Sequence, residues 1–359
     1  MRLQIVLIGL AMSCEGAHRD RDGMQSFVPS NAPVFGDFGS DELTVAPPDG
    51  SFDTDHDCTA TSALGACTAL TDACVCRAAT ISIGTLHVTG SRMLVLLASR
   101  ELTVGTLLDV GGHGATPGPG AIAGYGSAAD AATNAAGGSF GTEGAADSRG
   151  SGAIAAGYGE PTLVPLVGGM TGQDGDGGSG GGGGGGVQLS AGDQLEIDGA
   201  IDASGGGGLG GTSTFSSDGA GAGGAGGGVL LEGASVVVDG MVRANGGAGG
   251  GGGGTDGWGT SGQDGSASPA RGGNPPDPAG CPLYGYVLGG GGGDGATGSG
   301  SATWGGYADS NSQCIGPVSF VGAGGGGGGL GRIHVSSATG CDCNGTFSPA
   351  PTFGTVEAR

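Results

Sequence analysis

The feature that most constrains this fold is an internal repeat of an apolar segment. Residues 94–104 carry apolar side chains at the period-two positions 94, 96, 102 and 104, and residues 187–197 align with them without a gap. Residues 229–238 supply a third copy that lacks one turn residue, and residues 332–336 supply a shorter fourth copy. A unit this short cannot bury its apolar face alone, so it becomes stable by stacking on its neighbours. The repeat therefore predicts that four distant segments form adjacent layers around one core.

The alternation within each copy predicts strands rather than helices. Apolar residues recur at every second position over much of the stretch from Ile81 to Val104, which is the period of a strand with one buried face. Asp-Gly pairs at 198–199 and 239–240 are turn formers between successive strands. Because parallel crossover connections are almost always right-handed, we predict an all-β fold, a short right-handed parallel β-helix (solenoid), over residues 79–345.

Long glycine-rich inserts separate the repeat units, at about 111–186, 204–228 and 245–331. They leave from the same corner of each unit, so we expect them to gather on one side. Glycine loses more backbone entropy on folding than any other residue, which makes disorder one interpretation of these inserts. The other is a packed, polyglycine-II-like arrangement, in which chains without side chains approach closely and hydrogen-bond to one another. We expect order near the strands and disorder at the tips.

The amino terminus predicts export. Arg2 is followed by a short apolar stretch over 3–12, too short to span a bilayer but typical of a signal peptide. Residues 10–14 resemble the end of a bacterial lipoprotein signal, in which cleavage frees Cys14 for lipidation. The residue that follows Cys14, Glu15, favours the outer membrane under the rule for that class. Ordinary secretion, with Cys14 incidental, is the alternative.

The remaining regions are assigned from composition. Residues 15–57 are polar, acidic and rich in proline, which predicts a flexible tether between residues 1–14 and the folded body. We expect residues 58–78 to form a cysteine-rich cap at the N-terminal end, and residues 341–359 a C-terminal cap and tail. The chain has 33 acidic and 11 basic residues and a net charge of -22, which excludes nucleic acid as a partner.

Cysteine usage supports an oxidising compartment. Nine cysteines are present, and an even number remains once Cys14 is set aside, which predicts disulfides. Pairing within 74–76 or within 341–343 would be strained, so we expect each of these cysteines to have a more distant partner. Zinc is the alternative for the first four, but their spacing lacks two CxxC knuckles, and we predict no metal site. The disulfide candidates are Cys58, Cys67, Cys74, Cys76, Cys281, Cys314, Cys341 and Cys343.

Two patterns that suggest catalysis have simpler explanations. Residues 137–141 match GxSxG, but that motif needs a strand before it and a helix after it, and the sequence predicts neither. Asp198 and Asp239 would stack on adjacent layers, as would Asp109 and Asp202, yet an aspartate before glycine is first a turn former. No set of basic or aromatic residues converges on these carboxylates. We therefore predict no catalytic residues and no cofactor.

A calcium loop is also suggested by spacing alone. The aspartates at alternate positions in 53–57 are spaced like the first ligands of an EF-hand. Cys58 then replaces the required glycine, and Leu64 stands where the bidentate glutamate is needed. Asp174 and Asp176 form a second acidic loop. A solvated acidic loop is the preferred interpretation of both.

Aromatic residues in the inserts are the candidates for ligand recognition. Exposed rings can stack on sugars or anchor a protein partner, whereas packing on a layer of glycines is the alternative fate. The candidate ligand-binding residues are Trp258, Tyr284, Tyr286, Trp304 and Tyr307.

A family resemblance rests on three features: residues 74–76, the Gly-Tyr-Gly-Glu-Pro stretch at 157–161, and the repeated strand, Asp-Gly, strand, Ala-Ser/Asn-Gly-Gly unit. Together they resemble uncharacterised glycine-rich exported proteins of myxobacteria and their relatives, often labelled PE-PGRS-like, over about residues 70–345. The resemblance implies a surface location and a β-helical fold, and it implies no activity.

The functional prediction follows from these observations together. We predict a non-enzymatic cell-surface lipoprotein with a structural or adhesive role, held to the membrane by a lipid anchor. A glycan-binding surface module that uses the insert aromatics is one alternative, and a degenerate carbohydrate-active β-helix is the other. The expected partners are the membrane and a cell-surface glycan or protein.

Overall fold

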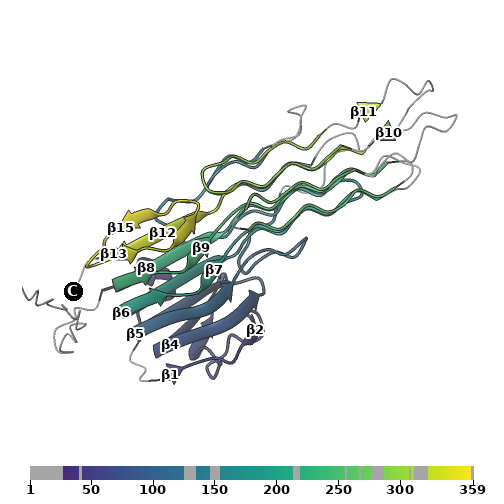
Figure 1. Cartoon of the computed structure of the whole chain (residues 1–359). Helices are drawn as coiled ribbons and strands as arrows, with labels where there is room; N and C mark the ends of the chain where they lie inside the picture. Colours follow the sequence, from purple (N-terminus) through teal and green to yellow (C-terminus); the bar gives the residue numbers. More distant parts are fainter. Residues whose placement is uncertain are drawn as a thin grey trace, which may run out of the picture.

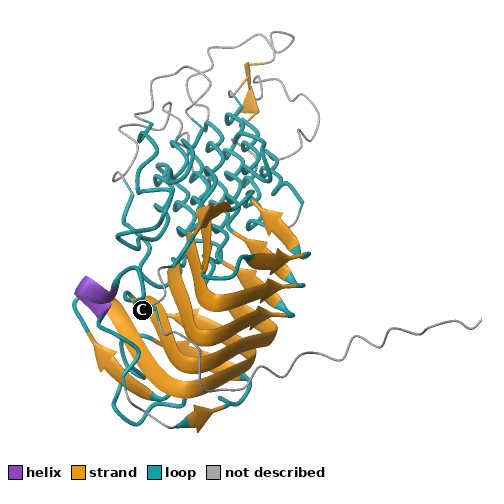
Figure 2. Ribbon diagram, turned by 90° about the vertical axis from the view of Figure 1, so that its left-hand side faces the viewer, coloured by secondary structure: helices purple, strands orange, loops and turns teal. Residues whose placement is uncertain are grey.

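The protein is nearly all-β in the computed structural model, and its strands form a curled parallel sheet (Figures 1 and 2). Among the described residues one helix occurs, α1 (Ala32–Phe35), and no helix is long and apolar enough to cross a lipid bilayer. The described residues are 27–39, 43–124, 135–145, 154–212, 219–254, 257–266, 268–275, 287–288, 290–306, 309–310 and 322–356.

The main sheet is built from five successive layers of strand. Each layer pairs in parallel with the next, so that the chain advances by one strand spacing per layer. Figure 2 shows the layers as stacked orange strands that bend around a common interior. The layers are β4 (Ala73–Thr89); β5 (Met93–Asp109); β6 (Gly186–Ile197) with β7 (Ala200–Asp202); β8 (Gly228–Val238) with β9 (Met241–Arg243); and β12 (Arg332–Ser337) with β13 (Cys341–Cys343) and β14 (Thr346–Ser348).

The register of the sheet confirms the internal repeat. Leu94 of β5 lies opposite Val187 of β6, which lies opposite Val229 of β8, which lies opposite Ile333 of β12. The four copies are therefore adjacent layers, as the sequence predicted. The turn residue missing from the third copy appears as a register shift between β6 and β8, just after Ala191.

The interior of the curled sheet is the main hydrophobic core. Side chains that alternate along each strand point into it from every layer and are fully shielded from water. Burial of each such side chain stabilises the fold by about 1.5–3 kcal/mol. Representative members are Leu96, Leu102, Leu189, Leu195, Leu231 and Val236.

The outer face of the sheet carries a second apolar cluster, and the segment 27–38 covers part of it. Outward side chains of the strands, such as Leu97 and Leu230, pack with Phe27, Phe35 and Phe38. Two short strands follow this segment and extend the sheet beyond β4: β1 (Thr44–Val45) and β2 (Gly50–Asp53).

Burial of the three phenylalanines explains why the segment 27–38 is ordered. Over residues 27–39 and 43–57 the structure therefore differs from the flexible tether predicted for residues 15–57. We call the segment 27–38 the strap, because it crosses from β8 to β4 on the outside of the sheet.

The cysteine-rich segment folds against β4. β3 (Ala66–Ala69) pairs antiparallel with β4, and disulfides join Cys58 to Cys74 and Cys67 to Cys76. Each member of the 74–76 pair therefore has the more distant partner that we predicted.

The pair at the other end of the sheet differs. Cys341 is joined to Cys343, contrary to prediction, because residues two apart on a strand point to the same face and both contact the core. Cys14, Cys281 and Cys314 lie outside the described residues.

The glycine-rich inserts gather on one side of the sheet, as predicted, beyond the ends of its strands. Figure 1 shows them as extended traces that run side by side away from the strands. We call this part of the molecule the glycine bundle. Its central segment, 219–228, hydrogen-bonds through the backbone to six other segments. These neighbours are 138, 170–178, 181–185, 203–209, 247–250 and 323–332.

Hydrogen bonding in the glycine bundle repeats every third residue. In the segment 246–252 the first, fourth and seventh amides donate to the segment 290–296. The second and fifth donate to 221–224, and the third and sixth to 260–263. A β-strand would direct its bonds to two neighbours in alternation, so this threefold rotation marks a different packing.

Close packing of backbones explains why the bundle consists of glycine. A Cβ atom added at Gly247 would lie 2.0 Å from the carbonyl oxygen of Gly206, and one at Gly249 would lie 2.0 Å from that of Gly325. No side chain fits at such a distance.

Three further short strands lie outside the five layers. β10 (Val287–Leu288) and β11 (Asp309–Ser310) form an antiparallel pair within the third insert. β15 (Thr352–Gly354) pairs in parallel with β12 and covers part of the last layer.

Candidate functional site

A cluster of histidines and aspartates lies where the sheet meets the glycine bundle. Asp109, the last residue of β5, is almost fully buried. Its Oδ2 atom lies 2.9 Å from Nδ1 of His87 and 3.0 Å from Nε2 of His113, and its Oδ1 atom accepts a hydrogen bond from the amide of Gly111. His87 reaches it because it lies directly opposite Asp109 in the register of β4 and β5.

His113 extends the cluster into the other inserts. Its Nδ1 atom lies 3.6 Å from Oδ2 of Asp264, in the third insert. The Oδ1 atom of Asp264 accepts hydrogen bonds from the amides of Gly114 and Gly207, at 2.8 and 2.7 Å. One imidazole and two carboxylates thereby connect all three inserts at their base.

The electrostatics of the cluster make it an ion pair. Hydrogen bonds to Asp109 and then Asp264 raise the pKa of His113 to about 10. Burial raises the pKa of Asp109, but hydrogen bonds from His113, Gly111 and His87 outweigh it and lower that pKa to about 2. At neutral pH His113 is a cation held between two anions, and a protonated imidazole cannot accept a proton as a general base.

A buried carboxylate on the outer face fastens the strap. Glu232 of β8 is fully buried and accepts hydrogen bonds from the amide and the hydroxyl of Ser30. Gln188 donates to it at 2.9 Å and Ser190 at 2.8 Å. Burial raises the pKa of Glu232, although these hydrogen bonds act in the opposite direction. Among the described residues no basic side chain pairs with it, so its partners are donors from the strap and the neighbouring strand.

A serine–histidine pair on β12 has the contacts of a nucleophile and its base. The Oγ atom of Ser336 lies 3.0 Å from Nε2 of His334, whose Nδ1 atom lies 2.7 Å from Oγ1 of Thr352. Gly354 of β15 covers the pair, since a Cβ atom there would lie 2.8 Å from both side chains. Both residues are buried, so a substrate could reach Ser336 only if β15 moved away.

In the motif at 137–141 and in the acidic loops, the side chains form local hydrogen bonds to the backbone. Ser139 is fully buried in the glycine bundle and donates to the carbonyl of Ala155, with no strand before it. In the loop 53–57, Asp53 accepts the amide of Asp55.

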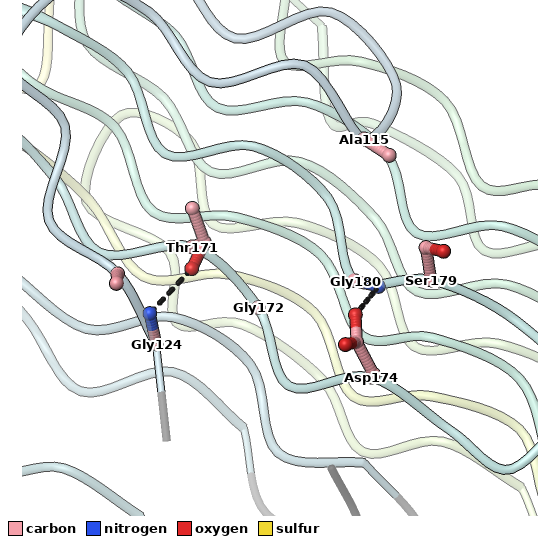
Figure 3. Close-up of a pocket in the computed structure, with 8 residues that line it drawn as sticks. Ala115, Gly124, Thr171, Gly172, Asp174, Ser179 and Gly180 are labelled. Atoms are coloured by element: carbon pink, nitrogen blue, oxygen red, sulfur yellow. Dashed lines mark hydrogen bonds between the residues drawn. The ribbon is translucent and has the colours of Figure 1, made fainter. Parts of the chain in front are cut away.

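The second acidic loop is braced in the same way. Asp174 accepts the amide of Gly180 at 2.7 Å, at the edge of a surface hollow where Thr171 accepts the amide of Gly124 (Figure 3). These side chains stabilise turns.

The predicted carboxylate pairs are adjacent, and ordinary interactions account for them. Asp109 lies opposite Asp202, and Asp202 forms an ion pair with Arg243 at 2.7 Å. Asp198 and Asp239 lie close enough to Glu196 to raise its pKa, after burial, which is the larger cause.

The candidate aromatic residues divide into two groups. Trp258 and Trp304 lie on the surface of the glycine bundle, with 70% and 65% of their area exposed. Tyr284, Tyr286 and Tyr307 lie outside the described residues.

The histidine–aspartate cluster was not predicted from the sequence. The segment that carries His87 is not one of the repeat copies, and two register shifts between β4 and β5 precede the pairing of His87 with Asp109. The contact with Asp264 depends on how the inserts pack.

Comparisons of the chain with protein-family models, with curated proteins and with solved structures found no match.

Proposed function

We propose that this protein is a non-enzymatic, lipid-anchored cell-surface protein with a structural or adhesive role. The observation that carries the proposal is the glycine bundle, in which three long inserts interlock through backbone hydrogen bonds beyond the ends of the strands. Such a body offers few side chains for chemistry, and its close packing resists deformation. It suits a projecting, load-bearing part of a surface protein.

We infer that the layers are coils of a short right-handed parallel β-helix and that the bundle is polyglycine-II-like. The parallel register of the four repeat copies supports the first inference, and the general handedness of parallel crossovers supplies its hand. The threefold rotation of hydrogen bonds along 246–252 supports the second, because extended glycine helices have three residues per turn.

The anchor would be a lipid on Cys14, with residues 15–26 joining it to the strap. Disulfides at Cys58–Cys74 and Cys67–Cys76 favour an oxidising compartment and hence export. The outer membrane or cell surface is the proposed location, and secretion without an anchor is the alternative.

Labelling with radioactive palmitate tests the anchor. Cells that express the full chain are compared with cells that express Cys14→Ser. We expect label on the first protein and none on the second, and protease added to intact cells should cleave the first. An unlabelled, freely released wild-type chain would contradict lipidation, and a labelled chain that protease reaches only after lysis would contradict surface exposure.

A second candidate function is glycan binding, and the exposure of Trp258 and Trp304 favours it. Two large rings lie exposed on a surface otherwise poor in side chains, where they can stack on a partner.

A further inference from the structure

We propose that a hollow on the glycine bundle, lined by residues 268–274 and 291–294, binds a neutral glycan between two tryptophan-bearing segments. The proposal rests on the second candidate function and is independent of the lipid anchor. Ser268, Pro269 and Asp294 are among the residues that line the hollow.

Four neighbouring segments of the bundle form the hollow and its borders. The segment that carries Trp258 joins the segment 268–274 through a hydrogen bond from the amide of Thr260 to the carbonyl of Asn274. The segment 268–274 in turn joins the segment 290–296, where the amide of Gly292 donates to the carbonyl of Gly273. The fourth segment, which carries Trp304, joins the segment 290–296 through a hydrogen bond from the amide of Thr303 to the carbonyl of Asp294. The two middle segments line the hollow. The segments that carry Trp258 and Trp304 are joined to them by the bonds of Thr260 and Thr303, and the two rings lie next to the lining residues in the bundle rather than among them.

The polar groups in the hollow suit a ligand that both donates and accepts hydrogen bonds. Within the described part of the chain, the guanidinium of Arg271 and the side-chain amide of Asn274 make no hydrogen bond. Asp294 uses Oδ1 to accept the amide of Gly272 at 2.9 Å, and Oδ2 remains available there. Donors and acceptors therefore converge on one space. A second hollow differs, because its lining holds no arginine or side-chain amide, and Thr171 and Asp174 there bond to the backbone.

This set of groups fits sugar hydroxyls better than an anion. A phosphate or carboxylate ligand needs donors alone, and the Asp294 carboxylate would repel it. The chain's net charge of -22 adds to that repulsion. Sugar hydroxyls use both kinds of partner, and the apolar faces of sugar rings can lie against tryptophan, as in sites where aromatic walls surround a few polar groups.

Several glycines line the hollow, and one of them has space for a side chain. A Cβ atom at Gly291 would meet nothing closer than 3.9 Å, whereas one at Gly292 would lie 2.0 Å from the carbonyl oxygen of Gly249. Gly291 lines the hollow and has room for a side chain to begin there. This makes Gly291→Leu a blocking variant that does not depend on the loss of any polar group.

Affinity electrophoresis of the purified full chain tests the site. Native gels contain hydroxyethylcellulose, xyloglucan, laminarin or dextran as neutral polysaccharides, and polygalacturonate as the anionic one. We expect at least one neutral polymer to retard the wild-type chain and polygalacturonate to have no effect. Gly291→Leu, which blocks the hollow, should weaken retardation about tenfold or more, and Trp304→Ala, which removes a flanking ring, should also weaken it. Phe353→Ala, which removes another exposed ring remote from the bundle, should leave it unchanged.

The possible results distinguish a failure of the proposed site from a failure of glycan binding as the function. If a neutral polymer retards the wild-type chain and all three variants alike, the hollow is wrong while glycan binding stands. If no polymer retards the wild-type chain, both are wrong. Retardation by polygalacturonate alone would overturn the neutral-ligand assignment. Near-ultraviolet and far-ultraviolet circular dichroism of each variant shows that a loss of binding is not a loss of fold.

Discussion

The curled sheet and the glycine bundle are ordered by opposite means. In the sheet, apolar side chains that point inward exclude water, and the backbone bonds follow the strand ladder. In the bundle, side chains are nearly absent, and each segment is held by backbone bonds that rotate among several neighbours. The sheet therefore tolerates a change of side chain where volume is kept, whereas the bundle tolerates almost none at its inner positions.

The two regions also carry separate spectroscopic reporters. The chain has two tryptophans, and both lie on the glycine bundle. Any change in tryptophan fluorescence on unfolding therefore arises in the bundle, while far-ultraviolet circular dichroism is dominated by the sheet.

The largest expected effect is a cavity in the core of the sheet. Leu195 is fully buried between Leu102 and Val236 in adjacent layers. Leu195→Ala should lower the free energy of unfolding by about 2–5 kcal/mol. Because the bundle is rooted in the sheet, fluorescence and circular dichroism should report the same shifted midpoint in urea. Separate transitions would show that the bundle holds together without the sheet.

A methyl group inside the bundle should have the next largest effect. The Cβ atom of Gly247→Ala would lie 2.0 Å from the carbonyl oxygen of Gly206, so the segments must separate. We expect a loss of about 1–3 kcal/mol, seen first in tryptophan fluorescence. Gly291→Ala is the matched control and should change the midpoint by less than about 0.5 kcal/mol. Equal effects from the two substitutions would contradict the close packing.

Loss of the strap's fastening should have a smaller, local effect. Glu232→Ala leaves the donors of Ser30, Gln188 and Ser190 without their acceptor, at a cost of about 1–3 kcal/mol. Limited proteolysis should then cut within 27–38 faster than in the wild-type chain, while tryptophan fluorescence is unchanged. Unaltered cleavage would show that the phenylalanines alone hold the strap.

The smallest expected effect is a dependence on pH from His113. Its pKa is raised in the folded state, so its stabilisation is complete below about pH 6.5 and is lost as the pH rises toward 10. The lowered pKa of Asp109 acts at the other end, with stabilisation lost as the pH falls from about 3.8 toward 2.

The variant His113→Gln isolates the alkaline part of this dependence. Urea midpoints followed by tryptophan fluorescence should fall between pH 7 and 10 in the wild-type chain and less steeply in the variant. Parallel curves for the two proteins would show that the ion pair does not hold the inserts.

The sequence was sufficient where a periodic pattern governed the structure. The repeat predicted the opposition of Leu94, Val187 and Val229, because a strand shifted by one residue would expose its apolar face. It also predicted that the inserts gather on one side.

Other features depend on contacts between segments that have no periodic pattern. The contact between His113 and Asp264 requires the packing of the inserts. The strap has no alternation that would reveal Phe27 and Phe35 as buried. The pairing of Cys341 with Cys343 was set aside on grounds of strain, yet the strand directs both toward the same face.

Hydrogen exchange of the glycine amides tests the central claim most directly. If backbone bonds hold the bundle, the amides of 221–228 and 246–252 will be protected from exchange to a degree comparable with those of β6 and β8. If these glycine amides exchange at the rate of an unstructured peptide while the strands remain protected, the inserts form no hydrogen-bonded body and the account is contradicted.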